Sequence, residues 1–242
     1  MSMQVYGKNA VKAALASKEA KILFTLKENA NEELVTLAQK LNINVKFVSF
    51  DELTRLASSK THQGYVASVG QIRGYSIEEL IKGCSEKPYP LILLLDGIED
   101  PHNLGAILRS ADAFGVDGII IKKHGEVPLN GTVAKVSTGA IHYVKVVTVA
   151  NLTQAITKLQ KAGFWIVSSA DAGASSYLSI DYRCPIGLVV GNEGRGISRL
   201  VLEHSDFIVK IPMQGHVNCL NASVATGVLL SEIVASRARH NK

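Results

Sequence analysis

Several common signatures are missing from this 242-residue chain. Its three cysteines, Cys84, Cys184 and Cys219, are odd in number and widely separated, so they form neither a disulfide framework nor a CxxC metal site. No G-x-x-x-x-G-K-[ST] run is present to hold a phosphate, and no G-x-S-x-G is present to carry a nucleophile. The glycines of GNEGRG at 191–196 depart from the G-x-G-x-x-G order, and Ile211 stands where a ribose-binding acid is expected. These absences disfavour the familiar nucleotide-binding and hydrolase sites.

Long hydrophobic runs are missing as well. The apolar run at 90–95 is far shorter than the roughly 20 residues that span a membrane. The chain opens with Val5, Tyr6, Gly7 and a helical pattern, so we expect no targeting segment and a cytoplasmic protein. With 47% apolar and 19% charged residues, the composition is that of a globular protein.

The excess of positive charge is modest. The net charge of +5 favours a polyanionic partner, although many basic proteins bind no nucleic acid. Nine basic and six acidic residues occur up to Gly70, against 17 and 15 thereafter. Any RNA-binding face must therefore come from the arrangement of these residues and not from a basic tail.

The first 70 residues predict a small α/β domain. Ser49 and Glu52 form an S-x-x-E pattern that is typical of a helix start. Glycines and prolines punctuate 71–90, where we expect a linker. Short helical and strand patterns alternate through the domain, at 8–16, 22–26, 32–41, 45–48, after Ser49, and at 65–69.

Residues 91–242 predict a second domain, of the α/β class, with a mainly parallel sheet. Its apolar strand patterns are separated by helical ones, which is typical of strands buried on both faces. Ligands bind to such sheets in the loops at the strand ends. Polar stretches at 100–111, 191–196 and 218–225 follow strands, so we expect them to build one site. The strands are expected at 91–95, 118–121, 144–147, 165–168, 186–190 and 207–211.

Four polar residues in these stretches are candidates for chemistry, and each has a structural alternative. Asn103 follows Pro101 at a helix start and could cap it, and Asn221 could cap the last helix. Glu193 could simply favour a helix N-terminus. Arg109 lies at the edge of a buried stripe, where it either binds an anion or is solvated.

Three motifs together carry a resemblance to a known family. NLGAILRSA at 103–111, GNEGRG at 191–196, and IPM at 211–213 followed by LNASVA at 220–225 resemble the motifs of the SpoU (TrmH) branch of the SPOUT methyltransferases. VYGKNAVKAAL and KTHQGYVA, near the two ends of the first domain, resemble the substrate-binding domain of that branch's enzymes for guanosine in 23S-type rRNA. The resemblance covers essentially the whole chain.

The resemblance implies a fold and partners that the patterns alone do not give. Residues 91–242 would form a deep trefoil knot, bind S-adenosyl-L-methionine in a bent form, and build a homodimer through the knot helices. Residues 1–70 would form an L30e-like domain that holds the rRNA. The implied reaction is 2′-O-methylation of a guanosine in large-subunit rRNA. Methylation of tRNA or of an rRNA adenosine, and a noncatalytic RNA-binding protein, are the alternatives.

The resemblance also assigns roles to residues. Because the high pKa of an arginine makes it a poor base, we expect Arg109 to bind an RNA phosphate and to stabilise the developing alkoxide. The proton would then pass to that phosphate or to water. The implied cofactor-binding residues are Gly191, Ile211 and Leu220. The implied active-site residues are Asn103, Arg109, Glu193 and Asn221.

Two residues of the last loop depart from the family pattern. Cys219 stands where relatives commonly carry serine, and a thiol is the weaker hydrogen-bonding group. His216 is not part of the pattern, and we interpret it as a loop histidine and not as a base.

Overall fold

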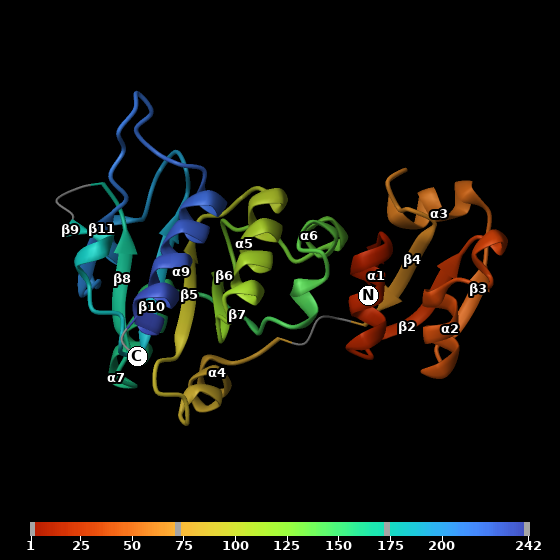
Figure 1. The fold of residues 1–242 in the computed structure, drawn as a ribbon, viewed down its shortest axis with the longest axis horizontal. Coiled ribbons are helices and arrows are strands. Elements are labelled where there is room, and N and C mark those ends of the chain that lie inside the picture. The colour runs from red at the N-terminus through yellow and green to blue at the C-terminus, as the bar shows by residue number, and fades with distance from the viewer. Residues whose placement is uncertain (1–2, 71–73, 172–174, 240–242) are drawn as a thin grey trace. The chain divides into compact units, whose positions relative to one another are not determined.

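Residues 3–70, 74–171 and 175–239 are described by a computed structural model, and they fall into two compact units. The first unit comprises Met1–Arg73 and Pro128–Tyr143. The second comprises Gly74–Val127 and Val144–Lys242. Each unit is built around its own sheet (Figure 1).

The first unit contains a four-stranded mixed sheet with the strand order β1-β4-β2-β3. Three of its strands and three of its helices confirm the sequence patterns, whereas β1, only four residues long, was not predicted. The side chain of Ser49 accepts a hydrogen bond from the Glu52 amide at 3.2 Å and starts α3. The elements are β1 Met3–Tyr6, α1 Lys8–Ala16, β2 Ala20–Thr25, the 3-10 turn η1 Lys27–Asn29, α2 Glu33–Lys40, β3 Asn44–Phe47, α3 Phe50–Ala57 and β4 Tyr65–Val69.

A segment from the middle of the chain belongs to this first unit. It contains α6 (Gly131–Val136) and the 3-10 turn η2 (Ala140–His142), and α6 packs against β1. A Cβ at Gly131 would lie 2.2 Å from the carbonyl oxygen of Gln4, so only glycine permits this approach. We predicted that 91–242 forms one domain; in the structure the segment 128–143 groups with the first unit, because α6 and η2 contact β1 and α1.

The second unit contains a seven-stranded sheet with the order β7-β6-β5-β10-β8-β11-β9. All six strand pairings described for it are parallel, which confirms the predicted sheet type. Strand β7 begins two residues later than its pattern indicated. The strands are β5 Leu91–Asp96, β6 Gly118–Lys122, β7 Val146–Val149, β8 Trp165–Ser169, β9 Ser175–Ser176, β10 Ile186–Gly191 and β11 Phe207–Lys210.

Helices cover both faces of this sheet. On one face α4, α7 and α8 pack against alternate strand residues such as Ile92, Leu94 and Val189. On the other, α5 and α9 lie side by side (Figure 1). Burial on both faces is the physical reason for strands that are apolar at every position. The helices are α4 Ile77–Cys84, α5 Pro101–Ala113, α7 Leu152–Lys161, α8 Arg199–Glu203 and α9 Ala222–Arg239, with a 3-10 turn η3 at Tyr177–Ser179.

Helix α4 lies within the segment 71–90 where we predicted a linker; residues 71–73 lie outside the described part. Ser76 and Glu79 form a complete capping box, with backbone-to-side-chain distances of 3.1 and 2.8 Å. Leu80 and Cys84 are buried in the core of the second unit. The S-x-x-E pattern that was recognised at Ser49 was present here too.

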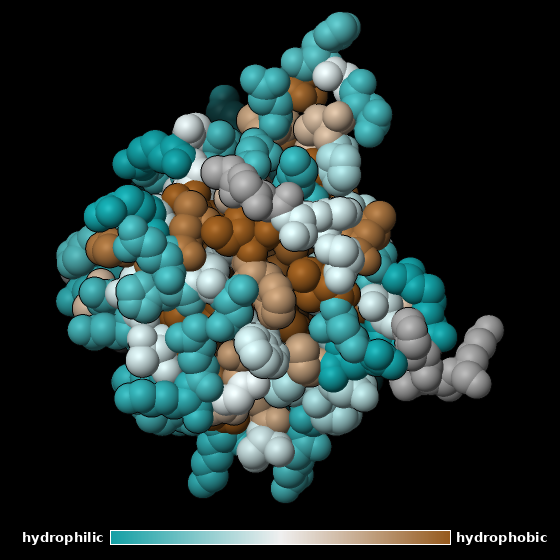
Figure 2. Space-filling model, turned by 90° about the vertical axis from the view of Figure 1, so that its left-hand side faces the viewer, coloured by the Kyte–Doolittle hydropathy of each residue, from teal (hydrophilic) through white to brown (hydrophobic). Residues whose placement is uncertain are grey.

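An apolar patch lies at the amino ends of β8 and β11. The rings of Trp165 and Phe207 are exposed and 5.7 Å apart between centroids. Figure 2 shows apolar side chains gathered among hydrophilic ones on the face of the second unit where β8, β9 and β11 lie. In the part of the chain that the structure describes, none of the helices has the length and apolar character needed to cross a membrane.

Candidate active site

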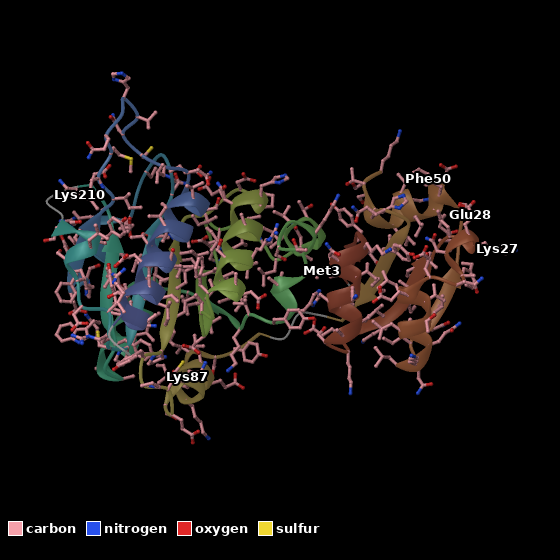
Figure 3. All side chains as sticks on the ribbon, in the orientation of Figure 1. Met3, Lys27, Glu28, Phe50, Lys87 and Lys210 are labelled. Carbon is pink, nitrogen blue, oxygen red and sulfur yellow. The ribbon has the colours of Figure 1, made fainter. Side chains whose placement is uncertain are left out.

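The three predicted polar stretches meet at the carboxyl ends of β5, β10 and β11. The GNEGRG loop follows β10, and its Asn192 amide donates to the Asp96 carbonyl at the end of β5, at 3.2 Å. Figure 3 shows Lys210, the last residue of β11, at the end of the second unit where these loops gather, and Lys87 at the opposite end. The parallel strands of the sheet thus bring together three segments that lie far apart in the sequence, as the sequence predicted.

Glu193 is the centre of a hydrogen-bonded cluster. Its Oε1 accepts from Asn103 Nδ2 at 2.6 Å, from Asn221 Nδ2 at 2.5 Å and from the Ala222 amide at 3.1 Å. Asn221 Nδ2 also donates to Asn103 Oδ1 at 2.9 Å. Three of the four predicted active-site residues are therefore in direct contact, one from each loop.

The two asparagines differ in their helix roles. Asp100 caps α5, since its side chain accepts from the His102 amide at 2.9 Å, so the capping alternative for Asn103 is wrong. Asn221 does cap α9, because its Oδ1 accepts from the Ser223 amide at 3.0 Å. Asn103 lies within the first turn of α5, where no cap is needed. Its amide is free to bind Glu193.

Gly191 sits where two backbone segments nearly touch. A Cβ on this residue would lie 2.4 Å from the carbonyl carbon of Gly196 and 2.6 Å from the amide nitrogen of Ile197. Gly196 has a φ of 67°, a backbone conformation that favours glycine. The glycines of this loop thus allow a close backbone pass that no other residue type permits at Gly191.

Asn192 was missed by sequence reasoning, although it lies within a recognised motif. Its Nδ2 donates to the carbonyl of Gly97 at 2.8 Å, and its Oδ1 accepts from the amides of Gly194 and Arg195 at 2.8 and 3.1 Å. This side chain fastens the GNEGRG loop to the β5–α5 loop. It thereby sets the distance between Glu193 and Asn103.

A cavity of about 400 Å³ lies beside the cluster. All three predicted cofactor-binding residues, Gly191, Ile211 and Leu220, line it, and Glu193 borders it as well. Its volume is in the range of small-molecule and cofactor sites. The remaining lining residues include the apolar Val190, Met213, Ala222 and Ala225, the polar Ser169, Asn192, Asn218 and Cys219, and the charged Asp171, Arg195 and Lys210.

The structure does not bring Arg109 into the cluster. Its side chain is exposed on α5, and within the described residues we find no ion pair or hydrogen bond for it. The predicted stripe beside it is buried, since Leu104, Ile107 and Leu108 are each at most 1% exposed. Arg109 therefore presents an uncompensated guanidinium to solvent.

Two acids fix the backbone beneath the site. Asp96 accepts from Lys122 Nζ at 2.6 Å and from the Ser198 amide at 2.7 Å; burial works to raise its pKa, but these bonds outweigh burial and hold the pKa below its ordinary value. Glu126 accepts from the Gly97 and Ile98 amides at 2.6 and 2.9 Å. Burial raises the pKa of Glu126 to about 7, against the lowering effect of those two amides and of Lys122.

The raised pKa of Glu126 predicts a pH-dependent stability. The folded protein holds this proton up to about pH 7 and the unfolded chain only to about 4.5, so stability from this group is present below pH 4.5 and is lost as the pH rises to 7. We expect the unfolding free energy of the wild type, minus that of Glu126→Gln, to fall by about 1–2 kcal/mol between pH 5 and 8, allowing for partial exposure. Urea unfolding at several pH values measures this difference. A difference independent of pH would contradict the assignment.

The second unit is that of an α/β enzyme, with a loop-lined cavity of cofactor size and an adjoining polar cluster at the carboxyl ends of a parallel sheet. Residues 90–231 match the SpoU rRNA Methylase family, and residues 4–74 match a domain described as RNA 2′-O ribose methyltransferase substrate binding. The chain belongs to the SpoU rRNA methylase family. It is an RNA 2′-O-ribose methyltransferase.

Two relatives match this chain along nearly its full length, and a third matches about two thirds of it. A Bacillus subtilis (strain 168) protein assigned by name to the TrmH family of tRNA/rRNA methyltransferases is 40% identical over 238 residues, which are 96% of this chain and 95% of that protein. The AdoMet-bound rRNA methyltransferase from Sinorhizobium meliloti has a TM-score of 0.82 and 26% identity, covering 99% of this chain and 88% of its own. The TrmH/SpoU tRNA modifying enzyme from A. aeolicus has a TM-score of 0.58 and 30% identity, covering 68% and 84%.

Proposed function

We propose that this protein uses S-adenosyl-L-methionine to methylate the 2′-hydroxyl of a guanosine in large-subunit rRNA. The observation that carries the proposal is the contact of Asn103, Glu193 and Asn221 beside a cavity of cofactor size. The rRNA assignment is supported by the S. meliloti rRNA methyltransferase, which resembles both units, whereas the A. aeolicus tRNA modifying enzyme covers only 68% of the chain. We also propose that residues 4–74 bind the RNA substrate in an L30e-like domain.

The residues of the cavity suit S-adenosyl-L-methionine. Because the backbone at Gly191 lies against the backbone at Gly196, backbone groups form part of the cavity wall. Met213, Ala222 and Ala225 supply apolar surface for an adenine. The side-chain amide of Asn218 is placed for polar atoms of the ligand. When bound, the cofactor supplies an electrophilic methyl group. The S. meliloti structure, which contains AdoMet, supports this choice.

The polar cluster orients the ribose in our scheme. Glu193 holds the two asparagine amides in place, and the remaining oxygen of its carboxylate is available to the substrate. Methyl transfer to a hydroxyl requires alignment of the attacking oxygen and removal of its proton, so positioning provides most of the acceleration. Arg109 lies six residues from Asn103, about 9 Å along α5, and we propose that it binds an RNA phosphate and stabilises the developing alkoxide.

Removing the guanidinium tests the role of Arg109. We expect Arg109→Ala to lower the rate of methyl transfer about 100-fold or more, because the developing negative charge loses its stabilising group. Cofactor binding, measured by calorimetry without RNA, is expected to be unchanged. Arg199→Ala, which removes an exposed arginine of α8 paired with Glu203, is the matched control and should keep full activity. Full methylation by Arg109→Ala would rule out this scheme.

We propose that the protein acts as a homodimer formed through α5 and α9, which would lie within a trefoil knot. Val224 and Val234 of α9 are exposed, at 51% and 37%, on a helix that is also buried against the sheet and α5. An exposed apolar strip on an otherwise packed helix is typical of a subunit contact. Sedimentation measurements distinguish the dimer from the monomer.

Competition between RNAs tests the substrate. The protein is incubated with radiolabelled S-adenosyl-L-methionine and equal amounts of large-subunit rRNA and tRNA, and label in each is counted. We expect label in the rRNA, at a guanosine. Label in tRNA alone, or at an rRNA adenosine, would overturn the substrate assignment, and transfer to neither would favour a noncatalytic RNA-binding protein.

A further inference from the structure

The net positive charge of the chain is confined to one unit. The first unit contains 11 Lys and Arg residues and 6 Asp and Glu residues, whereas the second contains 15 of each. The whole formal charge of +5 therefore belongs to the unit that matches the substrate-binding family. A division of the chain at Gly70 hides this difference in net charge, because Arg73 and Lys135 also belong to the first unit.

Three lysines of the first unit line a single hollow of about 590 Å³. Lys18 follows α1, Lys21 lies in β2, and Lys40 ends α2, and all three side chains are exposed. No acidic residue lines the hollow, and in the described part of the chain none of the three lysines has an ion pair. Its other lining residues are Ala20, Leu41, Asn42 and Ile43.

Acidic side chains on α2 and beside the hollow are engaged elsewhere. Glu19, the neighbour of Lys18, contacts the imidazole of His142. Glu32 and Glu33, at the start of α2, pair with lysines of α1 at 3.5 and 2.6 Å. Glu32 and Glu33 therefore compensate lysines outside the hollow, and Glu19 contacts His142, so none of these three acids is paired with a lysine of the hollow.

Helix ends account for only part of this charge. Two helices, α1 and α2, end at the hollow, and lysine is favoured there because a helix C-terminus carries about half a negative charge. Two such ends require about one positive charge. Three ammonium groups leave a surplus of about two, which a bound polyanion would neutralise.

We infer that this lysine hollow, formed by Lys18, Lys21 and Lys40, binds the phosphate backbone of the substrate RNA. The inference rests on the RNA methyltransferase activity and not on which RNA is the substrate. Lysines act on phosphates as point charges and carry no sequence information, so the hollow fixes the position of the RNA on the first unit. The hollow therefore does not itself select the nucleotide that is methylated.

Salt-dependent binding tests the inference. Affinity for a large-subunit rRNA transcript is measured between about 0.05 and 0.3 M salt for the wild type and for K18A/K21A/K40A. Each lost phosphate contact reduces the slope of log affinity against log salt by about 0.7–0.9, so we expect a reduction of about 2–3 and at least about tenfold weaker binding near 0.15 M. In methylation assays KM for RNA should rise while kcat stays unchanged.

A matched control variant distinguishes phosphate contacts in the lysine hollow from attraction by the overall positive charge of the first unit. K27A/K46A/K60A removes the same charge from exposed sites of the first unit outside the hollow, and its slope should stay near that of the wild type. K18R/K21R/K40R should retain binding, and unchanged cofactor affinity and melting temperature show that the alanine variant is folded. If the two alanine variants show equal slopes of log affinity against log salt, or if K18A/K21A/K40A keeps the wild-type slope, the lysine hollow does not bind RNA phosphates. Absence of RNA binding by the wild type would refute the proposed function as well.

Discussion

Gly191→Ala is expected to abolish cofactor binding, with an affinity loss of at least about 100-fold. The added methyl group would lie 2.4 and 2.5 Å from the carbonyl carbon and oxygen of Gly196, and backbone atoms have no rotamer by which to move away. The loop must shift, and the wall of the cavity shifts with it. Overpacking of this kind also costs about 1–3 kcal/mol of stability. Calorimetric titration with S-adenosyl-L-methionine and thermal unfolding measure the two effects.

Gly194→Ala is the matched control, in the same loop. Its new Cβ would meet Asn192 Oδ1 at 3.5 Å, an ordinary contact, and Gly194 has no positive φ. We expect its stability to equal that of the wild type and its cofactor affinity to change much less. Binding by Gly191→Ala within about threefold of the wild type would show that the close pass does not shape the cofactor site.

Glu193→Ala is expected to lower kcat for methyl transfer by about 100- to 1,000-fold. The substitution leaves three donors without their acceptor, namely the side-chain amides of Asn103 and Asn221 and the backbone amide of Ala222. Hydrogen bonds to a charged group contribute about 1.5–3 kcal/mol each, so both asparagines lose their fixed orientation. Steady-state kinetics should show the loss in kcat with little change in RNA affinity.

Two further substitutions test whether the charge of Glu193 matters: Glu193→Gln, which removes the charge, and Glu203→Ala on α8, which is a control. Glu193→Gln keeps one acceptor oxygen but adds an amide that faces other donors, so we expect an intermediate loss of about 10- to 50-fold. Glu203→Ala removes an exposed acid whose partner is Arg199, and it should leave the rate unchanged. Equal rates for Glu193→Ala and Glu203→Ala would contradict the role of the cluster.

Much of the second unit could be predicted because its strands are buried on both faces. Runs such as 91–95 and 186–190 are apolar at every position, and no other element of that length explains them. Polar residues placed directly after such strands had to meet at one edge of the sheet. The contact between Asn103, Glu193 and Asn221 follows from this geometry, even though each residue alone had a structural explanation.

Long-range packing was the part that the sequence could not supply. Nothing local in the segment 128–143 indicates that it packs against β1, since the decisive feature is the space that Gly131 leaves for Gln4. Glu126 likewise resembles a surface acid in sequence, and only the fold places it on the amides of Gly97 and Ile98. Helix α4 is different, because the sequence contains its S-x-x-E pattern at Ser76, but the glycines and prolines around this pattern are also typical of a linker.

Caps were the least predictable feature of the site. Both Asp100 and Asn103 are good capping residues, and the difference between them is three positions in the chain. Helix boundaries depend on where Pro101 can start the helix, which places Asp100 at the cap and leaves Asn103 for the cluster. The functional assignment of Asn103 therefore depends on the observed helix start.

The position of the transferred methyl group tests the central claim most directly. Large-subunit rRNA is labelled with the protein and radioactive S-adenosyl-L-methionine and then hydrolysed with alkali, which requires a free 2′-hydroxyl at each cleaved bond. We predict that the label remains in an alkali-stable dinucleotide and that complete digestion releases it as 2′-O-methylguanosine. Label in an alkali-labile nucleotide, with the methyl group on a base, would contradict a site built around the ribose.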